Sequence, residues 1–201
     1  MKVIMTGGGT GGHIYPAIAI ADEIKKRFPD AEILFVGAKR GLEKTLVPDN
    51  GYPIKLIPVQ GFNRKNPLKN VEVLRDLKQG NKLSKQILKE FQPDVVMTDI
   101  RMPYMDGLEL CSNIRQRFPA TKLLLFTGFD DFEYAKEAVH LEIEEYILKP
   151  LNLAEITEVF KKLKTKLDDE LNEKKNTDIL KQYYAASLPV LQSNFYTTLI
   201  E

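Results

Sequence analysis

The segment Gln92-Pro93-Asp94-Val95-Val96-Met97-Thr98-Asp99 lies near the middle of the 201-residue chain and predicts a short buried strand. Pro93 and Asp94 end the helical pattern before it, apolar or β-branched residues follow, and Asp99 closes the run. Open α/β sheets place their ligand sites at the carboxyl ends of parallel strands. We therefore expect the Asp99 carboxylate to project from the edge of such a sheet.

Five more apolar runs on either side of this strand have the length and composition of buried strands. They are Lys2–Thr6, Glu32–Val36, Ile54–Val59, Lys122–Thr127 and Glu145–Leu148, with the central strand at Asp94–Thr98. Stretches of helical length alternate with them: Ile14–Phe28, Gly41–Asn50, Pro67–Phe91, Gly107–Phe118, Phe132–Leu141 and Leu153–Leu171. This alternation predicts a doubly wound α/β fold, a three-layer sandwich with a parallel sheet of about six strands covered by helices on both faces.

The last predicted helix has a clear start and an unclear end. Asn152 can cap its first turn, and Glu155 three positions later resembles a capping box. Beyond Leu171 the chain is highly charged and then apolar. We expect residues 176–201 to form a helical or apolar tail, which either frays and folds back or packs on a second chain as a homodimer.

Composition excludes several classes of protein. Hydrophobic residues make up 43% and charged residues 28% of the chain, as in ordinary globular domains, and no apolar run approaches the length of a membrane span. The single cysteine, Cys111, excludes an intrachain disulfide and indicates a reducing, cytoplasmic location. A net charge of +1 gives no basic field for nucleic acid.

The charge is unevenly distributed. Residues 1–92 hold 16 basic and 9 acidic side chains, a net charge of +7, whereas residues 93–201 hold 13 basic and 19 acidic side chains, a net charge of −6. The two parts therefore have the composition of two different proteins.

A glycine-rich turn follows the first strand. Gly7-Gly8-Gly9-Thr10-Gly11-Gly12-His13 opens the first helix, where free amide groups and the helix dipole can bind phosphate. A tight connection without a ligand is the alternative. The turn lacks the Lys-Ser/Thr ending of a P-loop, which disfavours nucleoside triphosphate hydrolysis.

Residues 2–96 resemble the N-terminal domain of the MurG-type glycosyltransferases, which transfer N-acetylglucosamine to lipid I. The residues that carry the resemblance are Gly8-Gly9-Thr10-Gly11-Gly12-His13, Pro16-Ala17, Phe35-Val36-Gly37, Glu43, Leu46-Val47-Pro48 and Gln60-Gly61-Phe62. The resemblance implies a loop facing a diphosphate, with Thr10 and His13 as its polar positions. The family's second glycine-rich loop and UDP-binding domain do not follow Val96, so we expect no transferase activity and at most weak anion or lipid-headgroup binding.

Each of the three strands predicted after residue 93 ends at a polar residue: Asp99, Thr127 or Lys149. Together they could hold a phosphoryl group, although an exposed aspartate in a turn is the plain alternative. From Pro93 to about Lys175 the chain resembles a response-regulator receiver domain, through the Asp99 segment, Phe126-Thr127-Gly128 and Glu145-Tyr146-Ile147-Leu148-Lys149-Pro150. The resemblance implies that Asp99 is the phosphoacceptor, Thr127 the switch hydroxyl, Tyr146 the switch aromatic and Lys149 the phosphate-sensing cation.

The first strand departs from the receiver pattern. Receivers hold magnesium with an acidic pair there, but this chain has Met5-Thr6-Gly7-Gly8. Magnesium requires such oxygen ligands. We therefore expect no cofactor, with only weak magnesium binding at Asp99, and little autophosphorylation.

The two resemblances meet at Pro93, where both families have a helix, Pro-Asp and an apolar strand. Strands from residues 1–92 and 93–175 can then form one Rossmann-like sheet in the order 3-2-1-4-5-6. We expect a single hybrid domain over residues 1–175, recombined and more plausibly engineered than evolved, with no complete catalytic site. The alternatives are a degenerate receiver that binds a partner around Tyr146 and Lys149, and a fragment that retains sugar-nucleotide or diphosphate binding at Gly8–His13.

Overall fold

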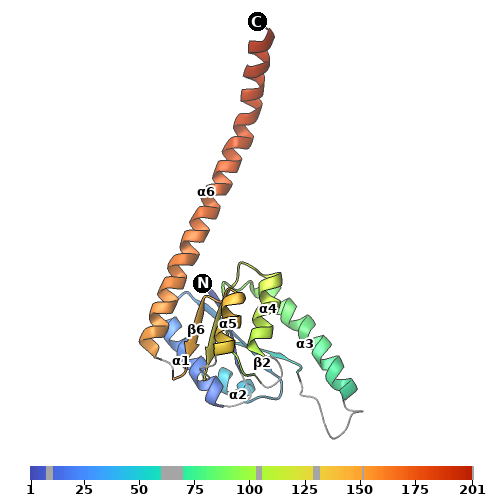
Figure 1. Ribbon diagram of the computed structural model, residues 1–201, viewed down its shortest axis with the longest axis vertical. Helices are drawn as coiled ribbons and strands as arrows, with labels where there is room; N and C mark the ends of the chain where they lie inside the picture. The colour runs from blue at the N-terminus through green and yellow to red at the C-terminus, as the bar shows by residue number, and fades with distance from the viewer. Residues whose placement is uncertain (8–10, 60–69, 103–105, 129–131, 151, 201) are drawn as a thin grey trace. The chain divides into compact units, whose positions relative to one another are not determined.

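The computed structural model describes residues 1–7, 11–59, 70–102, 106–128, 132–150 and 152–200. The chain divides into two compact units, Met1–Val159 and Phe160–Glu201. The elements, labelled in Figure 1, are β1 (Lys2–Thr6), α1 (Gly11–Arg27), β2 (Glu32–Ala38), α2 (Glu43–Asp49), β3 (Ile54–Ile57), α3 (Asn70–Phe91), β4 (Val95–Asp99), α4 (Gly107–Arg117), β5 (Lys122–Thr127), α5 (Phe132–His140), β6 (Glu145–Leu148) and α6 (Leu153–Ile200).

One parallel sheet holds all six strands in the order β3-β2-β1-β4-β5-β6, which confirms the predicted topology. β1 and β4 pair in continuous register from Val3 opposite Val95 to Thr6 opposite Thr98. The junction of the two sequence resemblances therefore lies within a single sheet. We call this β1–β4 pairing the strand seam.

Hydrogen bonds reinforce both ends of the strand seam. At its start the Lys2 amide donates to Asp94 Oδ2 at 2.7 Å, and the Asp94 amide donates to the Lys2 carbonyl at 2.9 Å. At its end the Thr6 and Thr98 hydroxyls lie 2.6 Å apart in the buried interior. The seam is thus a fully paired part of the sheet.

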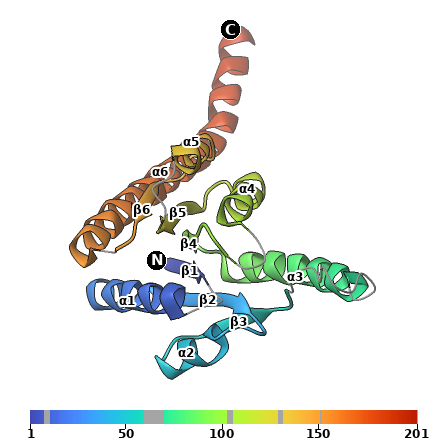
Figure 2. The same ribbon diagram turned by 60° about the horizontal axis from the view of Figure 1, so that its bottom comes forward.

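Helices cover both faces of the sheet. Figure 2 shows α1 on one side and α3 and α4 on the other, the arrangement that right-handed crossovers give to this strand order. The predicted apolar stripe of α1 is confirmed, because its five members, Ile14, Ala17, Ile18, Ala21 and Ile24, are all buried.

The core crosses the junction in sequence. One cluster of buried side chains contains Ile4, Leu34, Ile87 and Leu88 from the N-terminal part together with Val96, Ile100, Leu108, Cys111, Ile114, Leu123, Leu125 and Ala138 from the C-terminal part. The two parts therefore share one hydrophobic core instead of forming two.

The end predicted for the last helix is wrong. α6 starts at Leu153, with Asn152 Oδ1 accepting from the Ala154 amide at 3.0 Å, as predicted. It does not end near Leu171 but continues without a break to Ile200 and includes Pro189. Glu173, Lys174 and Lys175 just after Leu171 are good helix formers, and neither glycine nor proline occurs between Leu171 and Pro189, so the charged sequence extends the helix.

The other helix and strand boundaries differ from the predictions by up to three residues at described positions. None of the described helices is both long enough and apolar enough to cross a membrane.

Candidate functional site

Asp99 ends β4, and its carboxylate is almost fully buried, with 2% of the side chain exposed. Its Oδ1 atom accepts a hydrogen bond from the Arg101 amide at 3.1 Å. Its Oδ2 atom contacts the Lys149 ammonium group and the His13 imidazole ring. Burial of a carboxylate is costly unless it is paired in this way, so these contacts are what allow Asp99 to remain in the interior.

Lys149 reaches Asp99 from the end of β6. Its ammonium nitrogen lies 2.5 Å from Asp99 Oδ2 and 4.8 Å from the centre of the Phe126 ring. Its amide donates to the Thr127 carbonyl at 2.7 Å, which fixes the backbone beside β5. The lysine side chain is 16% exposed, so solvent screens the ion pair only in part.

His13 reaches the same carboxylate from the first turn of α1. Its Nδ1 atom lies 2.5 Å from Asp99 Oδ2 and 3.3 Å from Lys149 Nζ. The sequence assigned His13 to a diphosphate loop, separate from the Asp99 site. The structure brings the two together, and we call His13, Asp99 and Lys149 the composite site.

The order of the strands explains why His13 lies beside Asp99. α1 begins at the carboxyl end of β1, which is the direct neighbour of β4. The predicted order 3-2-1-4-5-6 contained the signal that the glycine-rich turn opens beside Asp99. The proximity of His13 and Asp99 was not predicted, because each motif was interpreted within the family that it resembles.

One of the two glycines beside Asp99 is required for the backbone to close around it. A Cβ atom on Gly107 would lie 2.1 Å from the Asp99 carbonyl oxygen, so only glycine fits there. Gly7 is more open, since a Cβ would meet the Phe126 ring at 3.4 Å and Asp99 Cβ at 4.0 Å. Gly7 follows β1, where receivers have their acidic pair.

The remaining predicted site residues lie around the composite site or outside the described residues. Thr127 ends β5 and is fully buried, and Tyr146 in β6 is half-buried. Gly11 and Gly12 form the first turn of α1 together with His13. Gly8, Gly9 and Thr10 fall outside the residues that the structure describes.

The described residues at the composite site offer few ligands for a magnesium ion. Asp99 supplies a carboxylate, but a lysine and a histidine already contact its Oδ2 atom, and the end of β1 offers Thr6 and Gly7. Hard divalent cations need several oxygen ligands. Among the described residues no group of three acidic, histidine or cysteine side chains could hold a metal.

The fold and the composite site define a doubly wound, receiver-like α/β domain with a buried aspartate at its switch point. Comparison with known proteins agrees. The profile of the response regulator receiver domain matches residues 60–161, and the chain belongs to that family. The profile of the glycosyltransferase family 28 N-terminal domain matches residues 3–102, so the chain combines the two patterns, as its sequence predicted.

The two matches overlap at residues 60–102. This range includes α3 and β4, the helix and strand around the junction. The segment Gln92–Val96, on which the two sequence resemblances meet, lies within this overlap.

Curated relatives of the N-terminal part are UDP-N-acetylglucosamine–N-acetylmuramyl-(pentapeptide) pyrophosphoryl-undecaprenol N-acetylglucosamine transferases. The enzyme of Lactobacillus helveticus is 54% identical over 99 residues, 48% of this chain and 27% of the relative. That of Phocaeicola vulgatus is 55% identical over 93 residues, 46% of this chain and 25% of the relative. The chain thus spans about a quarter of the length of these relatives.

Solved structures of both families share the fold. The receiver domain of AraT from Geobacillus stearothermophilus matches 85% of this chain and 97% of its own, with a TM-score of 0.53 and 23% identity. MurG from Acinetobacter baumannii matches 69% of this chain and 38% of its own, with a TM-score of 0.50 and 19% identity. At these identities the likeness concerns the fold alone.

Proposed function

We propose that this chain is a recombined α/β domain in which neither parental activity is complete, and in which His13 and Lys149 close the receiver-like phosphoacceptor site. The supporting observation is that both side chains contact Oδ2 of Asp99. An attacking carboxylate oxygen needs an accessible lone pair, and phosphoryl transfer needs positive charge placed on the entering phosphate. In this chain His13 and Lys149 contact the Asp99 carboxylate itself and not an entering phosphate.

The same proposal covers the transferase-like part. The receiver pattern matches residues 60–161, which include the place after Val96 where the transferase pattern would have its second glycine-rich loop, and the chain spans about a quarter of the length of the related transferases. We therefore propose that it transfers no hexose. Because the junction falls on a segment common to both families, we favour an engineered or selected chimera over an evolved enzyme.

Phosphorylation tests the proposal directly. The full chain is incubated with acetyl phosphate and magnesium, and its intact mass is measured, with Asp99→Asn as the control for the modified residue. We expect the wild type to stay unmodified. The double variant Gly7→Asp, His13→Ala places a carboxylate at the end of β1 and removes one contact of Asp99, so it should gain modification at Asp99. Rapid magnesium-dependent modification of the wild type would contradict the proposal.

A second candidate function is partner binding at the face around Tyr146 and Lys149. It is favoured by two exposed apolar side chains, Val139 on α5 and Leu148 on β6, which are 76% and 41% exposed. Pull-down of a defined receiver-binding partner before and after Val139→Asp would test it, and equal capture by both proteins would count against this face.

Diphosphate binding at the glycine-rich turn is the weaker candidate. A diphosphate would have to displace the contact between His13 and Asp99, so we expect no saturable binding of UDP-N-acetylglucosamine in calorimetry. Binding that is lost in Gly11→Asp would support it instead.

We also propose that α6 mediates homodimerisation. Its second half exposes Ile179, Leu180, Tyr183 and Tyr184, and isolated helices gain most of their stability from packing. Light scattering should show a dimer for the wild type and a monomer for the double variant Leu180→Lys, Tyr184→Lys. A wild-type monomer would contradict this proposal.

A further inference from the structure

A cavity of about 220 Å³ lies between the sheet and the helices α3 and α4, within the unit Met1–Val159. Ile4, Val36 and Val96 line it from three adjacent strands, β1, β2 and β4. Leu88 of α3 and Ile114 of α4 line it from the helices. Its lining is therefore mainly aliphatic and comes from both sides of the junction in sequence.

The packing of the two helices explains the cavity. α3 contacts β3 and α4 contacts α5, and both helices lie on the same face of the sheet (Figure 2). Gly80 brings α3 close to the sheet edge, since a Cβ there would lie 2.8 Å from the Pro58 carbonyl oxygen. α3 belongs to the transferase-like part and α4 to the receiver-like part. Interiors are normally filled to crystal-like density, and this one is not.

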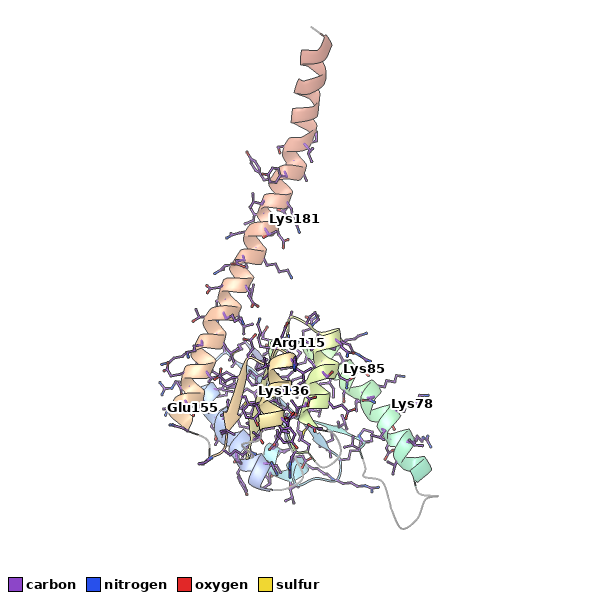
Figure 3. The ribbon with its side chains drawn as sticks, in the orientation of Figure 1. Lys78, Lys85, Arg115, Lys136, Glu155 and Lys181 are labelled. Atoms are coloured by element: carbon purple, nitrogen blue, oxygen red, sulfur yellow. The ribbon has the colours of Figure 1, made fainter. Side chains whose placement is uncertain are left out.

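Cationic and neutral polar side chains also line the cavity. Lys85 of α3 and Arg117 of α4 are both exposed, and Figure 3 labels Lys85 on its helix. Ser84 adds a hydroxyl group. The lining also includes Glu43, whose buried carboxylate accepts from the Ala38 amide at 2.9 Å. An anionic group beside Lys85 and Arg117 would thus be favoured over a cationic one.

We propose that this cavity binds a small amphiphile with an apolar body the size of a bicyclic aromatic and a single anionic head. An apolar cavity of roughly 150 Å³ is enough to stay dry and bind benzene, and this one is larger. The body replaces empty space with contacts to Ile4, Val36 and Ile114, while the head remains beside Lys85 and Arg117, where it keeps its hydration. None of the three residues of the composite site lines the cavity, although Thr6 and Gly7 at the end of β1 do, and the proposal goes beyond the proposed function.

The probe is 2-naphthoate, titrated into the full chain and followed by amide chemical shifts, with the neutral 2-naphthalenemethanol for comparison. We expect saturable binding with a dissociation constant on the order of 1 mM or tighter, the range for a ligand of this size. The largest shifts should fall on β1, β2, α3 and α4. No saturation up to the solubility limit, or largest shifts on α6, would overturn the proposal.

Filling the cavity supplies the structural control. Ser84→Phe, and from the sheet side Val36→Leu, should raise the melting temperature, because they replace empty space with contacts. Ser84→Phe should also weaken binding by at least about tenfold. Ser187→Phe on α6 is the matched control and should leave binding unchanged. Undiminished binding in folded Ser84→Phe and Val36→Leu variants would refute the site.

Substitutions on α3 test whether Lys85 contacts the anionic head of the ligand, and Figure 3 labels both Lys85 and the control residue Lys78. Lys85 lines the cavity and Lys78 is exposed on the same helix. Lys85→Gln should weaken 2-naphthoate binding by about threefold, the effect of one exposed charge, and leave the alcohol unaffected. Lys78→Gln should change neither. Equal effects of the two variants would overturn the assignment of the anionic head to this rim.

Discussion

The transferase-like and receiver-like parts contact each other both in the sheet and in the helical layer, and they pack differently in the two layers. In the strand seam β1 and β4 pair in continuous register, and the Thr6 and Thr98 hydroxyls are 2.6 Å apart. In the helical layer α3 and α4 leave a cavity of about 220 Å³. Parallel strands join through backbone groups that every residue carries, whereas helices join through side-chain shapes that must match. Recombination therefore preserves the sheet more readily than the helical layer.

The largest expected effect comes from a matched pair of glycine substitutions. Gly107→Ala should destabilise the fold by about 3 kcal/mol or more, because its Cβ would lie 2.1 Å from the rigid Asp99 carbonyl. Gly80→Ala should cost about 1 kcal/mol or less, because α3 can shift into loose packing and gains helix propensity. Denaturant unfolding measures both. Equal costs would show that the helical layer is as rigid as the β4–α4 turn.

Lys149→Met should have the next largest effect. It leaves the buried Asp99 carboxylate with one cationic neighbour fewer, which we expect to cost about 3 kcal/mol in the free energy of unfolding. Lys164→Met is the control, since Lys164 pairs with Asp168 on an exposed helix face and should cost less than about 0.5 kcal/mol. A loss for Lys149→Met no larger than that of the control would mean that Asp99 does not depend on the lysine.

Thr6→Val should have a smaller effect on the strand seam. It removes the hydrogen bond between the Thr6 and Thr98 hydroxyls, while Thr98 can still donate to the Asp99 carbonyl at 3.1 Å. A net loss of about 1 kcal/mol is expected for one buried hydrogen bond, and thermal unfolding measures it. An unchanged melting temperature would show that backbone pairing alone holds the seam together.

Ionisation of the Cys111 thiol should lower the stability of the fold only at high pH. Burial of this thiol in α4 raises its pKa to about 12, against a nearby Arg115 that lowers it less. The pKa of this thiol is higher in the folded protein than the value of about 8.5 for an unfolded cysteine. Its contribution to the stability of the folded state is therefore fully present below pH ~8.5 and is lost as the pH rises toward 12. Wild type should therefore lose more stability than Cys111→Ala between neutral pH and pH ~11.

Thiol labelling checks the same packing. At neutral pH the folded protein should react with a thiol reagent far more slowly than the unfolded protein, because little thiolate forms in the core. Fast labelling in native buffer would indicate that the packing of α4 opens to solvent.

Much of the fold was predictable from the sequence. Three strands, Lys2–Thr6, Lys122–Thr127 and Glu145–Leu148, have the predicted bounds, because short apolar runs bounded by turn residues are a strong local signal. The end of α6 was not predictable in this way. Charged residues after Leu171 suit a solvated helix and a loop equally well, and no glycine marks an end.

The sequence by itself determined the two family resemblances, the strand order and the positions of Asp99 and Lys149, because these depend on local motifs and on the handedness of crossovers. Only the tertiary structure decided that His13 contacts Asp99 and that α3 and α4 leave a cavity. Both result from packing between segments far apart in the sequence. Neither parent specifies the fit of its side chains to those of the other.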